Sequence, residues 1–219
     1  MRVEGWGAHM PRGAAQREAR ARLDDRDAAE RLGHFLRQEL ERLAEGWRGA
    51  PVVLCIGSDR STGDALGPLV GSLLLEHGLP RDQVAGDLSL PVHASNLRRV
   101  WAELRQRRPR GAVIAVDACL GRQESVGTLT AGLGPLRPGA GVNKDLPPVG
   151  DVFLTGTVNV SGFMEYFVLQ NTRLSLVVAM ARRMTGAVLA ALGRPVPAAL
   201  TPLSGVGIGL PLAGDGAGA

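Results

Sequence analysis

The chain has 219 residues, 45% of them apolar, which is enough for one globular domain to bury a core without disulfides or metal ions. Only 4% of the residues are aromatic, which argues against a module that stacks nucleic-acid bases on its side chains. The formal charge is +4, from 25 basic and 21 acidic residues, and this small excess permits weak binding to acidic partners without requiring it.

Three features predict a cytoplasmic location. Cys55 and Cys119 each lie in or just after an apolar run, so we expect buried thiols and no disulfide framework. The first twenty residues contain no continuous apolar stretch, so we expect no secretory signal. The apolar segment 163–192 is interrupted by charged and amide side chains, which predicts a core helix and no membrane span.

Hydrophobic periodicity in the first half predicts helices that alternate with short buried strands. The N-terminus lacks such periodicity and is rich in Gly, Ala, Arg and Glu, which is typical of disorder. In chain order we expect a disordered arm over 1–22, a helix over 24–45, a strand over 51–57, a helix from Asp64 to about His77, a strand over 84–92 and a helix over 95–108.

The second half continues the alternation, which favours a doubly wound, mostly parallel α/β sheet with helices on both faces, in one domain over 23–192. We expect a strand over 111–118, a strand near an edge over 126–133, a long loop over 135–150, a strand over 151–158, a helix capped by Ser161 and ending near Leu192, and a flexible tail over 193–219.

The arginines between Arg98 and Arg110 form the densest basic stretch of the chain. We interpret them as the solvated face of a helix; the alternative is a docking patch for an acidic protein or nucleic acid.

Polar side chains follow the predicted strands, and in open parallel sheets ligands bind beyond the carboxyl ends of the strands. Asp64 follows the first strand and Asp117 ends the third. Two carboxylates within a few ångströms cannot both ionise freely, so one retains a proton. Such a pair can activate water and protonate a leaving nitrogen, which is the chemistry of amide hydrolysis. The alternatives are a helix N-cap for Asp64 and a loop-orienting hydrogen bond for Asp117.

Further polar residues at the same rim are candidates for substrate binding, and no cofactor is expected. Lys144 is the only lysine of the chain, and its compact ammonium group suits a site that a guanidinium would not fit; the alternative is an ordinary exposed loop residue. His93 is either a structural histidine or a proton carrier. Together with the two aspartates it could hold one metal ion, which we keep as an alternative. The candidate substrate-binding residues are Asp59, Thr62, His93, Lys144 and Asn159.

Long runs of the sequence resemble the YyaC-type sporulation proteins of endospore-forming bacteria. The resemblance extends from about Val52 to Met180. It rests on the runs CIGSDRSTGDALGPLVG, AVDACLGR, LRPGAGVNKDLPPVGD and GTVNVSGFMEYFVLQNTRLSLVVAMA.

That family is similar in turn to the germination protease of spores, through three short motifs that contain Asp64, Asp117 and Pro138 to Val142. The germination protease is regarded as an atypical aspartic protease, so the resemblance implies that Asp64 and Asp117 are catalytic. It also implies the three-layer α/β/α fold of hydrogenase-maturation endopeptidases. Those enzymes bind a nickel centre of their substrate with acidic and His side chains, which is the basis of the metal alternative at Asp64, His93 and Asp117.

The resemblance therefore implies a peptidase of the forespore or spore core that hydrolyses a spore protein or peptide. One alternative is a non-catalytic sporulation factor that binds a peptide or protein at the same rim. The other is a metal-sensing maturation endopeptidase. We expect no specific nucleic acid and no membrane as partner, and we leave self-association into a homo-oligomer open.

Overall fold

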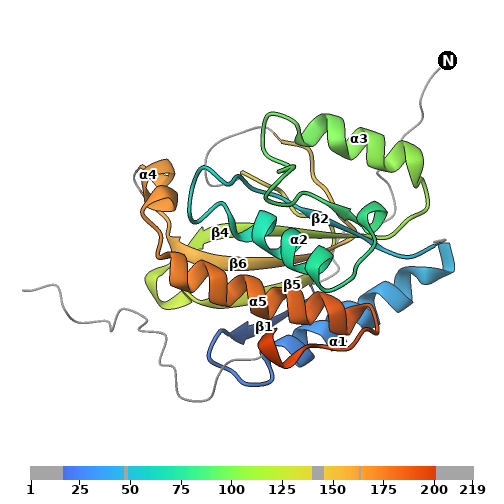
Figure 1. Cartoon of the computed structure of the whole chain (residues 1–219), viewed down its shortest axis with the longest axis horizontal. Helices are drawn as coiled ribbons and strands as arrows, with labels where there is room; N and C mark the ends of the chain where they lie inside the picture. Colours follow the sequence, from blue (N-terminus) through green and yellow to red (C-terminus); the bar gives the residue numbers. More distant parts are fainter. Residues whose placement is uncertain (1–16, 47–48, 140–145, 163, 201–219) are drawn as a thin grey trace, which may run out of the picture.

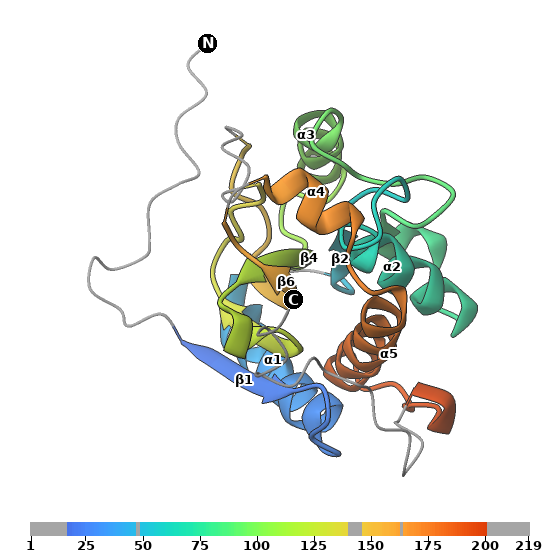
Figure 2. The same ribbon diagram turned by 90° about the vertical axis from the view of Figure 1, so that its left-hand side faces the viewer.

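The computed structural model describes residues 17–46, 49–139, 146–162 and 164–200, where a six-stranded sheet lies between two helical layers (Figure 1, Figure 2). The strands are β1 (Glu18–Arg22), β2 (Val52–Cys55), β3 (Val84–Ala85), β4 (Val113–Gly121), β5 (Thr128–Leu133) and β6 (Val152–Val160). The α-helices are α1 (Ala28–Leu43), α2 (Leu66–Glu76), α3 (Leu97–Arg107), α4 (Glu165–Gln170) and α5 (Leu174–Ala191), and short 3-10 turns occur at 44–46, 81–83, 123–125 and 198–200.

The order of strands across the sheet is β1-β5-β6-β4-β2-β3. β6, β4, β2 and β3 are parallel to one another, whereas β5 is antiparallel to both β6 and β1. The apolar runs of β2 and β4 suit this position, because parallel strands are covered on both faces. The mostly parallel sheet and the three-layer α/β/α fold are thus confirmed.

Side chains of β4 alternate between two packed cores. Ile114 and Val116 pack with residues of α1, α2 and α5, whereas Val113 and Ala115 pack with residues of α3. Because successive side chains of a strand point to opposite faces, Asp117 continues the set that faces α3. Figure 2 shows α3 on one side of the sheet and α1, α2 and α5 on the other.

α5 is the one described helix that is long and apolar enough to cross a membrane by length and composition alone. Its 18 residues have a mean hydropathy of 1.4, and 67% of them are buried within the protein. It packs against α1 and α2, which agrees with the prediction of a core helix over this segment.

The N-terminal edge of the sheet corrects one prediction. Residues 18–22 are not part of a disordered arm, because they form β1, which pairs with β5 along its length. β5 lies between β1 and β6, next to the edge of the sheet, which agrees with the prediction of a strand near an edge. β1 escaped prediction because a charged edge strand with little buried surface has no apolar run. The rest of the predicted arm, 1–16, lies outside the described residues.

The strand predicted over 84–92 is much shorter in the structure, because β3 begins at Val84 but ends at Ala85. Gly86 has a φ of +94°, and the buried carboxylate of Asp87 accepts hydrogen bonds from the amides of Ser89 and Leu90. These contacts form a turn in place of a strand. Pairing resumes only at Val92, which bridges Ile56 in parallel.

The single helix predicted from Ser161 to Leu192 is two helices, α4 and α5, separated at 171–173. The Ser161 hydroxyl donates to the carbonyl oxygen of Gly121 at 3.2 Å and does not cap a helix. Residues 193–200 are not a flexible tail, because Leu200 is buried against the core. The remaining predicted tail, 201–219, lies outside the described residues. α1 is confirmed but shorter than the predicted 24–45.

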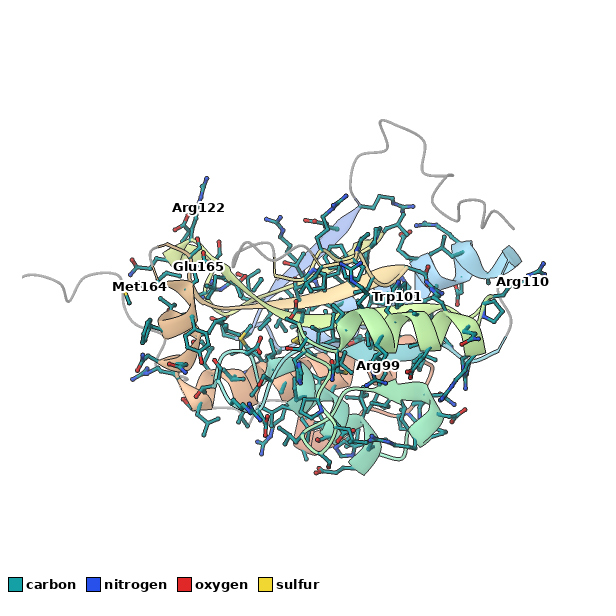
Figure 3. The ribbon with its side chains drawn as sticks, turned by 90° about the horizontal axis from the view of Figure 1, so that it is seen from above. Arg99, Trp101, Arg110, Arg122, Met164 and Glu165 are labelled. Atoms are coloured by element: carbon teal, nitrogen blue, oxygen red, sulfur yellow. The ribbon has the colours of Figure 1, made fainter. Side chains whose placement is uncertain are left out.

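Several arginines of the α3 region are engaged within the chain. The guanidinium group of Arg105 donates two hydrogen bonds of 2.9 Å to Asp151, and Arg99 donates to Glu103 at 2.8 Å. Arg108 pairs with Asp82. These ion pairs favour the interpretation of a solvated, internally neutralised face over that of a free docking patch. Figure 3 shows Arg99 and Trp101 on α3 and Arg110 beyond its C-terminal end.

Candidate functional site

Asp64 lies in the loop that joins β2 to α2. The main-chain carbonyl oxygen of Asp64 accepts a hydrogen bond from the amide of Ser58 at 3.1 Å, which closes the loop on itself. Gly57 permits this closure, because its φ is +143° and a side-chain carbon there would lie 1.9 Å from that oxygen. α2 begins at Leu66 and its N-cap is Ala65. The alternative role of Asp64 as the N-cap of this helix is therefore wrong.

α4 contacts the Asp64 loop through a backbone hydrogen bond. The amide of Gly63 donates to the carbonyl oxygen of Leu169 at 2.8 Å. The side-chain amide of Asn159, at the end of β6, donates to the carbonyl oxygen of Val168 and to the hydroxyl of Thr172, both at 3.2 Å. The carboxyl end of β6, α4 and the Asp64 loop therefore form one connected unit. Asn159, a predicted substrate-binding residue, has a structural role here.

Asp117 lies within β4, paired with Thr155 of β6, and does not end the strand as predicted. Its side chain is buried, with 8% of the residue exposed, and its carboxylate accepts a hydrogen bond from the amide of Ala118 at 2.8 Å. Because Asp117 is in the middle of a strand, it does not orient a loop, which was the alternative interpretation.

The two aspartates interact electrostatically although they are far apart in the sequence. Burial raises the pKa of Asp117 well above its usual range, and the negative charge of Asp64 raises it further; the hydrogen bond from Ala118 acts in the opposite direction. The surroundings of Asp117 thus favour its protonated form when Asp64 is charged. The folded chain brings the predicted pair together; their catalytic role stays a prediction.

Cys119 also lies beside Asp117, a position that sequence reasoning missed. Its thiol is 3.4 Å from the hydroxyl of Thr157 on β6. Burial raises the pKa of Cys119 and the hydrogen bond with Thr157 acts in the opposite direction, so the thiol is a neutral polar group. The prediction of a buried Cys119 is wrong, because this residue is only partly buried. The signal was available: Asp117 and Cys119 are two residues apart and share a face if the strand continues.

The other predicted site residues lie in several segments and differ in burial. Asp59 is exposed and Thr62 is half-buried, both in the Asp64 loop. His93 is half-buried before α3, and the amide of Gly57 binds the neighbouring carbonyl oxygen of Val92 at 2.8 Å, so His93 follows the end of β2 in space. Lys144 lies outside the described residues.

The metal alternative finds no support in the grouping of side chains. Among the described residues, no cluster of three or more His, Cys, Asp or Glu side chains could hold a metal ion. Asp64, His93 and Asp117 are all described, so the three do not form a ready-made ligand set.

Two enclosed polar atoms near the site have no hydrogen-bond partner within the described part of the chain. They are the hydroxyl oxygen of Ser61, in the Asp64 loop, and Oε2 of Glu165, at the start of α4. Buried polar atoms in native proteins are nearly always hydrogen-bonded, to protein or to water. Both atoms lie in the two segments joined by the Gly63–Leu169 hydrogen bond.

Comparison of the sequence with known proteins identifies the family of this chain. The chain matches the family described as Protein of unknown function (DUF1256) over residues 20–187. It is 56% identical over 158 residues to the Uncharacterized protein YyaC of Bacillus subtilis (strain 168), which covers 72% of this chain and 75% of that protein. A solved structure, the NiFe hydrogenase maturation protease HycI from Thermococcus kodakarensis KOD1, matches with a TM-score of 0.46 and 20% identity over 71% of this chain and 99% of that chain. A likeness this weak carries no argument about activity. The matched segment and the close relative show that the chain belongs to the DUF1256 family and is a YyaC-type protein.

Proposed function

We propose that this protein is a peptidase that hydrolyses peptide bonds with Asp64 and Asp117, and that it acts on a protein or peptide in the cytoplasm of the developing spore. The observation that carries the proposal is that Asp117 is buried, and that burial and the negative charge of Asp64 both raise its pKa well above the usual range. Carboxyl groups whose surroundings hold them in different protonation states are the usual acid and base of hydrolytic sites.

In this mechanism the two carboxyl groups have different tasks. Asp64, as the charged member, takes a proton from a water molecule whose oxygen attacks the carbonyl carbon of the substrate. Asp117 gives its proton to the carbonyl oxygen, which produces a neutral tetrahedral diol. The diol then collapses: the C–N bond breaks, the leaving nitrogen receives the proton that Asp64 holds, and a diol proton returns to Asp117.

The test is cleavage of a mixed peptide library and of small spore proteins, followed by mass spectrometry. We expect product from the wild type and a loss of at least about 100-fold in rate for Asp64→Asn and for Asp117→Asn. The matched control is Asp24→Asn, at an exposed carboxylate beside β1, which should retain full activity. Equal cleavage by all four proteins would refute the assignment.

A second candidate is a non-catalytic factor that binds a polypeptide at the same rim. It is favoured by the apolar side chains exposed on α4 and beside it. This candidate predicts that the wild type binds a spore protein without cleaving it, and that Asp117→Asn binds that protein as tightly as the wild type does.

A further inference from the structure

Large apolar side chains are exposed together on α4 and its flanks. Tyr166 is 62% exposed, Phe167 52% and Met164 51%, and the rings of Tyr166 and Phe167 contact each other edge to face at a centroid distance of 5.9 Å. Val160 precedes this group and Leu174 follows it, both also exposed. We call these five residues the α4 surface. Contiguous apolar surface that remains exposed on a folded protein commonly marks a binding site.

The helix that carries the α4 surface adjoins the candidate active site. α4 binds the Asp64 loop through the Gly63–Leu169 hydrogen bond, and Asn159 joins α4 to the end of β6. An extended chain that crosses the two aspartates would therefore pass α4 within a few residues of the cleaved bond. Figure 1 shows α4 at the left, at the same end of the sheet as the arrowhead of β4 and the adjoining end of β6.

Glu165 indicates what kind of molecule covers this surface. Glu165 begins α4, and its Oε2 is enclosed without a hydrogen-bond partner in the described part of the chain. An enclosed carboxylate oxygen is costly unless a donor reaches it. The backbone amides of a polypeptide supply such donors, whereas hydrocarbon chains of a lipid do not. Figure 3 places Glu165 beside Met164 of the α4 surface.

We propose that the α4 surface binds a bulky apolar side chain of an extended polypeptide substrate, and that Glu165 accepts a hydrogen bond from a backbone amide of the same segment. The proposal rests on the proposed peptidase function and names its substrate class: polypeptides with a large apolar residue near the cleaved bond.

The test measures binding separately from cleavage, in full-length protein that carries Asp117→Asn. The probes are two fluorescent Gly/Ser peptides that differ at one central residue, Phe or Ser, and the measurement is fluorescence anisotropy. We expect the Phe peptide to bind about tenfold more tightly than the Ser peptide. The double change Tyr166→Ser and Phe167→Ser should abolish this preference, and Glu165→Ala should weaken the binding of both peptides.

The matched control is the double change Leu88→Ser and Leu90→Ser, which removes exposed leucines from the loop after β3. It should leave the preference for Phe unchanged. Equal binding of the two peptides, or a preference that survives the α4 change, overturns the proposal. Because all the substituted apolar side chains are exposed, the melting temperatures of these variants should match that of the parent, which confirms that they fold.

Two further measurements identify other occupants. If sedimentation shows a dimer that the α4 change converts to a monomer, and neither peptide is preferred, the surface is an interface between copies of this chain. If the α4 change instead abolishes binding to phosphatidylglycerol vesicles, the surface binds membranes. Either result overturns the proposal. A preference for Phe without cleavage by the wild type refutes the peptidase and leaves the binding surface intact, so the two failures are distinguishable.

Discussion

The amide of Gly63 and the carbonyl oxygen of Leu169 form a hydrogen bond of 2.8 Å that joins the Asp64 loop to α4. No room remains at this contact. A side-chain carbon on Gly63 would lie 2.8 Å from a methyl carbon of Leu169 and 2.9 Å from the hydroxyl of Thr172. The position of Asp64 therefore depends on glycine one residue earlier.

Gly63→Ala should displace α4 from the Asp64 loop. Because overpacking of this kind costs about 1–3 kcal/mol, we expect a lower free energy of unfolding and faster amide hydrogen exchange in α4. The measurement is denaturant unfolding combined with exchange detected by mass spectrometry. The control is Gly46→Ala, where a side-chain carbon would meet no atom within 4 Å. Unchanged exchange in α4 would show that the contact does not hold the loop.

Asp117→Asn should stabilise the protein at neutral pH. Burial and the charge of Asp64 raise the pKa of Asp117 in the folded state, so the folded chain binds more protons than the unfolded chain between the two pKa values. The stability contributed by Asp117 is therefore complete below its unfolded pKa and is lost as the pH rises through its folded pKa. Asparagine keeps an oxygen that can accept the hydrogen bond from the amide of Ala118. Because its side chain does not ionise, the variant does not lose this stability as the pH rises.

Thermal unfolding measures this difference. At pH 7 we expect the melting temperature of Asp117→Asn to exceed that of the wild type by at least about 2 °C, and the gap should narrow as the pH is lowered toward 4. Asp24→Asn, at an exposed carboxylate, is the control and should show no such pH-dependent gap. A variant at Asp117 that is less stable than the wild type at pH 7 would contradict the interpretation.

Asp64→Asn should lower the pKa of Asp117. The substitution removes the negative charge that disfavours ionisation of Asp117, while the burial of Asp117 remains. The pKa of Asp117 should thus fall but stay above its usual range. Titration of the carboxyl carbon of Asp117 by NMR measures this directly. Asp59→Asn, an exposed position in the same loop, is the control, and an equal effect of both substitutions would argue against a specific pair.

The two aspartates were predictable because each is an acidic residue after or within an apolar strand, and parallel strands present their carboxyl ends at one edge. The exact place of Asp117 was not predictable in the same way. The apolar run weakens after Ala118, yet β4 continues to Gly121 because β6 pairs with it over the same length. This pairing, which is a contact between distant segments, is what brings Cys119 next to Thr157.

The break between α4 and α5 shows the same limit. Residues 171–173 contain neither Gly nor Pro, so local propensity gives no reason for the helix to end there. In the folded chain the hydroxyl of Thr172 is buried, donates to the carbonyl oxygen of Val168 and accepts from Asn159. A tertiary contact with β6 therefore sets the boundary and creates the separate α4 that carries the exposed apolar side chains.

Arg183→Met should destabilise the fold without affecting the candidate site. Arg183 of α5 is buried, with 2% exposed, and its guanidinium group donates to the carbonyl oxygens of Asp25 at 2.6 Å and Arg26 at 3.1 Å. These contacts fix the loop between β1 and α1 against α5.

Methionine can replace the buried hydrocarbon of the arginine but leaves these carbonyl groups without a donor. We therefore expect the free energy of unfolding to fall by about 2–4 kcal/mol. The adjacent Arg182 is exposed, and Arg182→Met should change the free energy of unfolding by less than about 0.5 kcal/mol. Denaturant unfolding measures both variants. They are a matched pair, because the two substitutions replace the same residue type at neighbouring positions of one helix. An equal effect of both substitutions would mean that the buried guanidinium group does not stabilise the β1–α1 connection.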